Sequence, residues 1–307
     1  MKVDLVYLWV DDKDSLWQEK RAKSASINAL KESTNECRFK NNDELKYSLR
    51  SAEKFAPWIN KIFIVTDNQV PSWLNTNCEK IRIVDHSEII PKDKLPIFNS
   101  CVIENRIPFI EDLSEYFLLA NDDTFFWGNV EENFFFDKEK TIFRVGKRIR
   151  NKKYRHLYGH SVFKAYQMIK NKFGISVPYF PHHNIDIYEK SVFLDCIKEF
   201  QADFDETLNH KFRTFEDVQR VIVSYYAIAK NRAIIKETEI NPLLKIFGKK
   251  NLESEYFALK KSNLSKIKNS EAKLLCINDN RKTTNIDREM MVKILEEKFP
   301  QPSQFER

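Results

Sequence analysis

The stretch VDLVYLWVDDKD, residues 3–14, gives the first indication of the fold class, because a mostly apolar run leads into Asp11, Asp12 and Asp14. Three further short apolar runs follow: KIFIV at 61–65, KIRIV at 80–84 and YFLLA at 116–120. Apolar runs of this length, separated by amphipathic stretches, are typical of strands buried on both faces of a mostly parallel sheet. The sequence therefore predicts an α/β fold with a mostly parallel, Rossmann-like sheet flanked by helices.

Polar residues follow each of the four runs, and acidic residues crowd together after two of them. The exits read Asp11-Asp12-Lys13-Asp14, Thr66-Asp67, Asp85-His86 and Asn121-Asp122-Asp123. Ligands of such sheets sit beyond the carboxyl ends of the strands, where these side chains would converge. Converging carboxylates repel one another unless a proton or a cation offsets their charge, and a hard divalent metal that carries phosphate oxygens does so. The pattern indicates an enzyme that handles a phosphorylated or nucleotide substrate.

Composition narrows the class of protein. The 307 residues, 42% of them hydrophobic and 24 of them Phe, can bury a sizeable core, as one large α/β domain or as a nucleotide-binding domain with an attached lobe. Only 5 residues are Gly, and neither a P-loop nor a G-x-G-x-x-G turn is available. Walker-type ATPases and Rossmann dehydrogenases are therefore disfavoured.

Charge gives a local signal. The net charge of +6 is a mild excess that does not require nucleic-acid binding, yet seven of the twelve residues at 144–155 are Lys or Arg and none is acidic. Such a run is most often a solvated loop. The sharper hypothesis is a contact for an anionic polymer or for anionic lipid head groups at the inner membrane.

Three features of the sequence bear on its compartment. The five cysteines are an odd number without a C-x-x-C pair, which is typical of reduced thiols. The chain starts almost directly with a predicted strand, which leaves no room for a leader, and no apolar run approaches the length of a membrane span. We therefore expect a cytoplasmic protein that is at most peripheral at the inner face of the membrane.

Periodicity predicts the helices. The clearest covers 42–56, starts after a capping asparagine and ends before Pro57. Arg38, Tyr47 and Arg50 fall off its apolar stripe, which leaves them freer to face a ligand. Helices dominate the chain beyond residue 129, and the other predicted helices cover 15–30, 99–107, 160–173, 187–200, 214–231 and 287–299.

Three polar motifs lie in the second half. The loop PHHNID at 181–186 contains His182 and His183; one histidine of such a pair is usually structural, but a neutral imidazole near the carboxylates is a ready base for a hydroxyl. Arg213 precedes a Thr-x-x-Asp capping pattern at 214–217, so its guanidinium would lie at a helix N-terminus and form an anion site. The stretch CINDNR at 276–281 is another apolar run that ends in Asn-Asp.

Together and in this order, the motifs resemble the Stealth family of sugar-1-phosphate transferases, which includes bacterial capsular polysaccharide phosphotransferases and the lysosomal-enzyme N-acetylglucosamine-1-phosphotransferase. The matching stretches cover nearly the whole chain, and those of the second region are the most specific. They are VDLVYLWVDDKD (3–14); RFKNNDELKYSLRSAEKFAPWINKIFIVTDNQVPSWL (38–74), HSEIIP (86–91), LPIFNSCVIE (95–104) and FLLANDDTFF (117–126); VPYFPHHNIDIYEKSV (177–192); and CINDN (276–280) with FPQPSQFE (299–306).

Two departures from the family pattern bear on the site. Asp12 stands where the family usually has Gly, so the resemblance carries over Asp11 and Asp14 as the functional acids. The usual histidine spacing of the third region is absent. An ungapped match favours His183, with His182 as the alternative.

The resemblance implies a GT-A-like sheet and one catalytic domain over 1–307. A nucleotide-sugar-binding α/β half would cover 1–128, and a largely helical half at 129–307 would add His and Arg to the site. The implied activity is transfer of a hexose-1-phosphate, in particular N-acetylhexosamine-1-phosphate, from a UDP-N-acetylhexosamine donor to a glycan or phosphoglycan hydroxyl. This reaction forms a phosphodiester and releases UMP in capsular or cell-surface polysaccharide synthesis.

The resemblance and the residue chemistry together predict the site. The expected catalytic residues are His183, His182, Arg213 and Asp11; the expected substrate-binding residues are Arg50, Asn121, Arg38, Asn99 and Asp279; the expected ligands of Mg²⁺ or Mn²⁺ are Asp122, Asp123 and Asp14. An alternative enzyme is a metal-dependent glycosyltransferase that transfers only the sugar and releases UDP. A catalytically silent glycan- or nucleic-acid-binding protein is disfavoured, because binding alone gives no reason for carboxylates at several strand exits.

Overall fold

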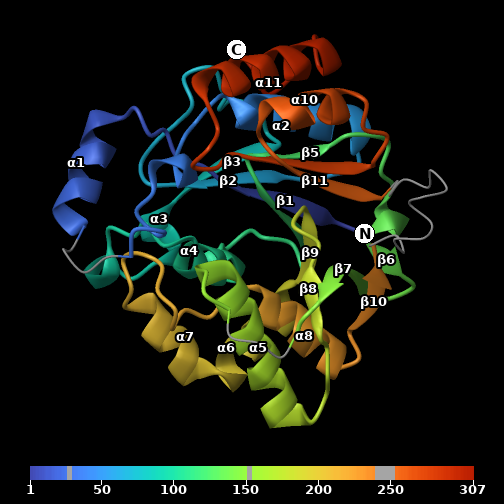
Figure 1. Cartoon of the computed structure of the whole chain (residues 1–307). Helices are drawn as coiled ribbons and strands as arrows, with labels where there is room; N and C mark the ends of the chain where they lie inside the picture. Colours follow the sequence, from blue (N-terminus) through green and yellow to red (C-terminus); the bar gives the residue numbers. More distant parts are fainter. Residues whose placement is uncertain (26–29, 151–153, 239–252) are drawn as a thin grey trace.

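A five-stranded mixed sheet forms the centre of the computed structural model, which describes residues 1–25, 30–150, 154–238 and 253–307 (Figure 1). The strand order is β3-β2-β1-β4-β9; the first four strands are parallel, and β9 runs antiparallel to β4. The five strands are β1 (Val3–Leu8), β2 (Ile62–Thr66), β3 (Ile81–Asp85), β4 (Tyr116–Asn121) and β9 (Asp186–Glu189). The predicted α/β class with a mostly parallel sheet is confirmed.

The four apolar runs of the sequence form the four parallel strands. All residues of β2 and all but the last of β1 are buried, as expected for strands covered on both faces. β3 lies at the edge of the sheet and is only partly buried, which fits its charged Arg82 and Asp85. The buried carboxylate of Asp4 in β1 accepts hydrogen bonds from Asn60, Lys61 and Ser114, so it stabilises the amino-terminal edge of the sheet.

Two smaller sheets follow, and they were not predicted. One has the order β10-β7-β6 with β8 also paired to β7, and the other has the order β11-β12-β5. Their strands are β6 (Phe136–Asp137), β7 (Lys140–Arg148), β8 (Tyr179–Pro181), β10 (Ala233–Glu237), β5 (Thr124–Phe126), β11 (Ser254–Ala258) and β12 (Leu274–Asn278). The prediction of a mainly helical second half was therefore incomplete. The strands β5, β6 and β8 have only two or three residues, which is too short for periodicity to distinguish.

Helices cover both faces of the central sheet: α2, α10 and α11 lie on one side, and α4 to α8 lie on the other (Figure 1). The α-helices are α1 (Ser15–Ser24), α2 (Glu44–Phe55), α3 (His86–Ile89), α4 (Ser100–Arg106), α5 (Leu157–Phe173), α6 (Lys190–Glu199), α7 (Gln201–Leu208), α8 (Val221–Ala229), α10 (Lys261–Lys268) and α11 (Asn285–Lys298). Short 3-10 helices are η1 (Glu36–Arg38), η2 (Lys92–Lys94), η3 (Ile107–Phe109) and η4 (Glu132–Phe134). Within the described ranges, no helix combines the length and the apolar character needed to cross a membrane.

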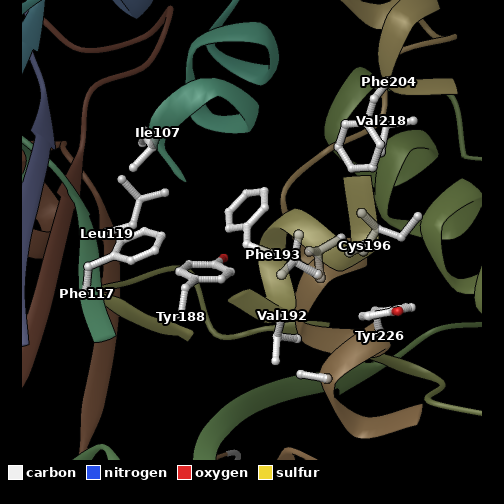
Figure 2. Close-up of a cluster of buried hydrophobic side chains, with 14 of the residues drawn as sticks. Ile107, Phe117, Leu119, Tyr188, Val192, Phe193, Cys196, Phe204, Val218 and Tyr226 are labelled. Atoms are coloured by element: carbon white, nitrogen blue, oxygen red, sulfur yellow. The ribbon is translucent and has the colours of Figure 1, made fainter. Parts of the chain in front are cut away.

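The largest hydrophobic cluster joins the two halves of the chain. Phe117 of β4 stacks on Tyr188 of β9 and on Phe193 of α6, with ring centroids 5.7 and 6.3 Å apart (Figure 2). This packing explains why the predicted helix over 187–200 is wrong at its start: all four residues of β9 are buried, and β9 pairs with β4 before α6 begins. The second half therefore completes the central sheet as well as covering it.

The basic run at 144–155 is not one exposed surface. Arg144 is only 2% exposed, because its guanidinium lies over the ring of Phe134 and donates to Glu253 at 2.9 Å. Arg144 therefore cannot belong to the predicted contact for anionic polymers or lipids. Lys147, Arg148 and Arg150 are exposed, whereas residues 151–153 lie outside the described residues.

Candidate functional site

A cavity of about 460 Å³ opens at the carboxyl ends of the parallel strands. The strand order fixes the sequence of groups along this edge: His86 and Asp67 follow β3 and β2, Val10 follows β1, Asp122 follows β4, and His183 precedes β9. Adjacent strands lie about 4.8 Å apart, so the edge is about 19 Å long. The cavity can therefore hold an elongated ligand that lies across several strands.

Three carboxylates form the acidic wall of the cavity. Asp122 and Asp123 form the turn between β4 and β5, and Glu44 is the first residue of α2. Burial, with the charges of Glu44 and Asp123, raises the pKa of Asp122 well above its ordinary value. Burial also raises the pKa of Glu44 to about 7 and that of Asp123 to about 6. Without a cation, burial and mutual repulsion favour the protonated forms of these groups.

The acidic wall fits a hard divalent cation. The Oδ1 atom of Asp123 is buried without a hydrogen-bond partner, while Oδ2 accepts from Asn278 at 3.0 Å. Mg²⁺ is typically held by one or two carboxylates, with waters and substrate phosphates in its other positions. Among the residues that the structure describes, no three His, Cys, Asp or Glu side chains already form a metal-binding group, so Asp122 and Asp123 would rely on such additional ligands.

The structure does not bring the acids of the first motif to this wall. Asp14 caps α1 by accepting from the backbone N–H groups of Leu16 and Trp17, and its other oxygen accepts from Gln69 at 3.1 Å. The bond from Gln69, followed by the backbone bonds, lowers the pKa of Asp14. Asp11 accepts from the backbone N–H of Lys13. Neither side chain lines the cavity, so the predictions of Asp14 as a metal ligand and Asp11 as a catalytic residue are not supported.

Two arginines line the cavity near His183. The Nε of Arg213 and the Nη1 of Arg220 are buried without a hydrogen-bond partner. Arg220 is close to Glu104 and Asp186, but its ion-pair distances of 3.6 and 3.7 Å exceed those of good hydrogen bonds. Unsatisfied cationic donors of this kind are rare in folded proteins and indicate a site for an anion.

Arg213 does not lie at a helix N-terminus, which corrects the prediction from the sequence. The expected helix over 214–231 begins only at Val221. Residues 214–217 instead form a polar turn, in which the fully buried carboxylate of Asp217 accepts from the N–H of Thr214 at 2.9 Å and from Asn99 at 2.8 Å. The positive potential around Arg213 therefore comes from its own guanidinium and from Arg38 and Arg220, which also line the cavity.

The two adjacent histidines have different environments. Both ring nitrogens of His182 have partners, Ser254 at 2.8 Å and Asp186 at 3.2 Å, and the residue is buried beneath the wall. His183 lines the cavity, and within the described part of the chain its ring makes no hydrogen bond. Burial, aided by the charge of Arg220, lowers the pKa of His183 to about 4. His183 is thus a neutral imidazole at pH 7 that can receive a proton from a ligand.

The opposite end of the cavity has a different chemistry. Asp67 is held by Lys20, whose Nζ is 3.0 Å from both carboxylate oxygens. Burial lowers the pKa of His86 to about 4, and its Nδ1 is buried without a partner. This end offers the neutral imidazole of His86 beside a carboxylate already paired with Lys20, whereas the end near His183 offers unpartnered cationic donors.

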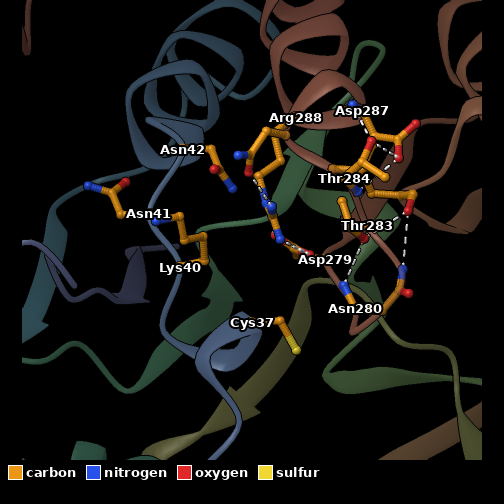
Figure 3. Close-up of polar contacts among 12 residues, drawn as sticks. Cys37, Lys40, Asn41, Asn42, Asp279, Asn280, Thr283, Thr284, Asp287 and Arg288 are labelled. Atoms are coloured by element: carbon orange, nitrogen blue, oxygen red, sulfur yellow. Dashed lines mark hydrogen bonds and ion pairs between the residues drawn. The ribbon is translucent and has the colours of Figure 1, made fainter.

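The remaining predicted substrate-binding residues divide into two groups. Arg38, Asn121 and Asp279 line the cavity, although Asp279 already forms a bidentate ion pair with Arg288 at 2.7 and 3.1 Å (Figure 3). Figure 3 also shows Cys37 and Lys40, two further cavity residues, on the segment near this pair.

Arg50 and Asn99 are structural. Arg50 is bound by Glu306 at 2.8 and 2.6 Å and by the carbonyl of Phe299, outside the cavity. Asn99 caps α4 and donates to Asp217. The predictions that Arg50 and Asn99 bind substrate are therefore not supported by their positions.

Two prominent site residues were missed. Glu44 has the position of an ordinary acidic residue in the first turn of a helix, so nothing in its local pattern indicated a cavity. Arg220 had no distinct signal, because DVQR at 217–220 fits within the predicted helix over 214–231. Its proximity to Glu104 depends on tertiary packing.

The fold and the site define an α/β protein with an acidic wall and a cationic wall around one cavity. Residues 38–144 match the family model of Stealth protein CR2, conserved region 2, and the chain belongs to the Stealth family.

Relatives with assigned names support this membership. The chain is 36% identical over 225 residues to the capsular polysaccharide phosphotransferase LcbA of Aeromonas hydrophila. The aligned region covers 70% of this chain and 62% of the length of that protein. It is 29% identical to the capsular polysaccharide phosphotransferase WcwK of Streptococcus pneumoniae over 99% of both chains. A solved structure of the galactosyltransferase LgtC with donor and acceptor sugar analogs aligns with 98% of both chains, at 11% identity and a TM-score of 0.43.

Proposed function

We propose that this protein transfers a sugar-1-phosphate from a nucleoside diphosphate sugar to a glycan hydroxyl in cell-surface polysaccharide synthesis. The expected donor is a UDP-N-acetylhexosamine, and the expected acceptor is a glycan or phosphoglycan. The acceptor oxygen attacks the β-phosphorus, the bond from that phosphorus to the bridging oxygen breaks, and UMP leaves. The names of LcbA and WcwK support this class of reaction.

The observation that carries the proposal is the arrangement of charge in the cavity. The carboxylates of Asp122 and Asp123 line the same space as the unpartnered donors of Arg213 and Arg220. Phosphoryl transfer needs little covalent chemistry from a protein, but it needs in-line positioning and neutralised charge on the phosphoryl oxygens. A divalent cation bound at Asp122 and Asp123 would supply part of that positive charge. Arg213 and Arg220 would donate to the oxygens of the transferred phosphoryl group.

His183 is the proposed base. Its imidazole lines the cavity with no hydrogen bond in the described residues, and its lowered pKa keeps it neutral at pH 7. A ring nitrogen can therefore accept the proton of the acceptor hydroxyl as the new oxygen–phosphorus bond forms. His182 would support the loop, since both of its ring nitrogens already have partners.

The sheet edge also suggests how the donor lies. With the diphosphate between Asp122 and Arg213, the nucleoside would extend past Val10 towards Asp67 and His86. The neutral hydrogen-bonding groups at that end suit a base or a ribose better than a phosphate. This direction leaves the space near His183 for the acceptor.

Nucleotide analysis tests the proposal. The protein would be incubated with Mg²⁺, a panel of UDP-sugars and oligosaccharide acceptors, and the released nucleotide would be identified by chromatography. We expect UMP. Release of UDP alone would support the glycosyltransferase alternative, and the absence of turnover with every donor would favour a binding protein.

A further inference from the structure

Tyr256 of β11 contacts two cavity residues, His183 and Asn278, without being part of the cavity lining itself. Its ring lies against His183, with centroids 5.3 Å apart and planes at 90°. Its hydroxyl donates to Oδ1 of Asn278 at 3.2 Å, and Nδ2 of Asn278 donates to Oδ2 of Asp123 at 3.0 Å. One short chain of contacts therefore connects the proposed base to a proposed metal ligand.

The orientation of His183 depends on ring contacts. Tyr158 packs edge-on against its other side, at 5.6 Å and 89°. Because the imidazole makes no hydrogen bond in the described residues, no carboxylate or carbonyl fixes its orientation. Catalytic bases are normally held by such a partner. Here the rings of Tyr158 and Tyr256 are in a position to orient His183 in place of such a partner.

The link through Asn278 is directional. Partial burial, with the charges of Cys276 and Asp123, raises the pKa of Tyr256 to about 12, so its hydroxyl remains a donor at neutral pH. Asn278 accepts this bond through its oxygen, which leaves its NH₂ group facing Asp123. Asn278 lies on β12 and Tyr256 on the paired strand β11, so both side chains come from one rigid unit.

We propose that Tyr256 is a positioning residue: its ring holds His183 in the cavity wall, and its hydroxyl acts through Asn278 to fix Asp123 relative to His183. The role of His183 as a base rests on the proposed function. The contacts themselves do not, so they can be tested without turnover.

Two variants separate the ring from the hydroxyl. Tyr256→Phe keeps the ring and removes the hydrogen bond, whereas Tyr256→Ala removes both. Tyr256 is 48% exposed, so both variants should fold. Matched controls are Tyr166→Phe and Tyr166→Ala, because the hydroxyl of Tyr166 bonds Ser176 outside the cavity.

The first readout is the imidazole NMR signal of His183, assigned by its loss in His183→Gln. The charged or titratable groups that act on this ring are Arg220, Asp186, His182 and Arg213, and it also contacts Tyr158 and Tyr256. In Tyr256→Ala, water reaches the ring, so the pKa of His183 should rise from about 4 towards its ordinary value. It should stay low in Tyr256→Phe and in the Tyr166 controls. An unchanged His183 signal in Tyr256→Ala would overturn the proposal.

The second readout is UMP release from UDP-N-acetylglucosamine with water as acceptor. We expect Tyr256→Ala to lower kcat on the order of tenfold with little change in donor KM, since a misplaced base affects the chemical step. Tyr256→Phe should have a smaller effect, together with weaker Mg²⁺ binding. A changed donor KM with unchanged kcat would contradict a positioning role. If the wild type released no UMP with water or with any oligosaccharide acceptor but the His183 signal shifted as expected, the proposed function would fail and the positioning role would stand.

Discussion

Glu44, the first residue of α2, lies close enough to Asp122 for its negative charge to raise the pKa of that carboxyl, in addition to the larger effect of burial. The two residues are far apart in the sequence and meet at the carboxyl edge of the sheet. Burial raises the pKa of Glu44 itself to about 7. This cluster stores unfavourable charge that a bound cation would neutralise.

Glu44→Gln should stabilise the metal-free protein at pH 7. A carboxyl whose pKa is higher in the folded state than in the unfolded state destabilises the fold as the pH rises from about 4.5 to 7, because the unfolded state ionises first. The gain should be on the order of 1 to 3 kcal/mol at pH 7 and should vanish near pH 4.5. Thermal unfolding at both pH values in EDTA measures it, and the comparison between pH values cancels any bond lost to Asn42. An equal effect at the two pH values would contradict the charge cluster.

Variants of Asp123 and Asp14 should distinguish a residue that binds metal from a residue that caps a helix. Asp123→Asn should lose Mg²⁺ affinity and activity while the protein stays folded, because one neutralised ligand weakens the site. Asp14→Ala should cost about 1 kcal/mol of stability, the usual effect of removing an N-cap, and should keep Mg²⁺ affinity. Calorimetric titration with Mg²⁺ and thermal unfolding measure the two effects. Full activity of the wild type in excess EDTA would exclude a metal requirement.

Arg213→Ala should lower kcat by on the order of 10²-fold with a smaller effect on donor KM, because its unpartnered Nε would act on charge that develops in the transition state. Arg50→Ala is the control: it breaks the ion pair with Glu306 outside the cavity, so it should lower the unfolding temperature and leave kcat nearly unchanged. Steady-state kinetics with thermal unfolding measures both variants. A lowered kcat in Arg50→Ala together with an unchanged kcat in Arg213→Ala would place the phosphate near Arg50.

His183→Gln should lower kcat by on the order of 10² to 10⁴, the usual contribution of a general base, with little change in stability. His182→Gln should instead lower stability by about 1 to 3 kcal/mol, because it disturbs buried hydrogen bonds to Ser254 and Asp186. Single-turnover kinetics and denaturant unfolding separate the two. If the His182 variant were stable but inactive and the His183 variant were active, His182 would be the base and His183 the structural residue.

The sequence predicted the parts of the site that depend on strand ends. Apolar runs identified the sheet, and Asn121, Asp122 and Asp123 after the last run identified the acidic wall. Parallel strands place their carboxyl ends at one edge of a sheet, so the residues that follow them lie close together. His183 and Arg213 were also predicted from short motifs, and both line the cavity.

The remaining residues depend on tertiary structure. Asp14 and Asn99 serve as caps, and Arg50 pairs with Glu306 from the far end of the chain. Family resemblance could not distinguish these structural roles from contact with a ligand. Glu44 enters the cavity through the packing of α2, and Arg220 enters it from the irregular segment before α8, which periodicity does not describe.

The fate of the donor's β-phosphorus distinguishes sugar-1-phosphate transfer from transfer of the sugar alone. The protein would receive a UDP-N-acetylhexosamine labelled with ³²P at the β-phosphate, together with Mg²⁺ and an oligosaccharide acceptor, and the glycan would be separated from the nucleotides. We expect the label to enter the glycan in a phosphodiester, in equal amount to the UMP released. Label found only in UDP, with an unlabelled sugar added to the glycan, would contradict it.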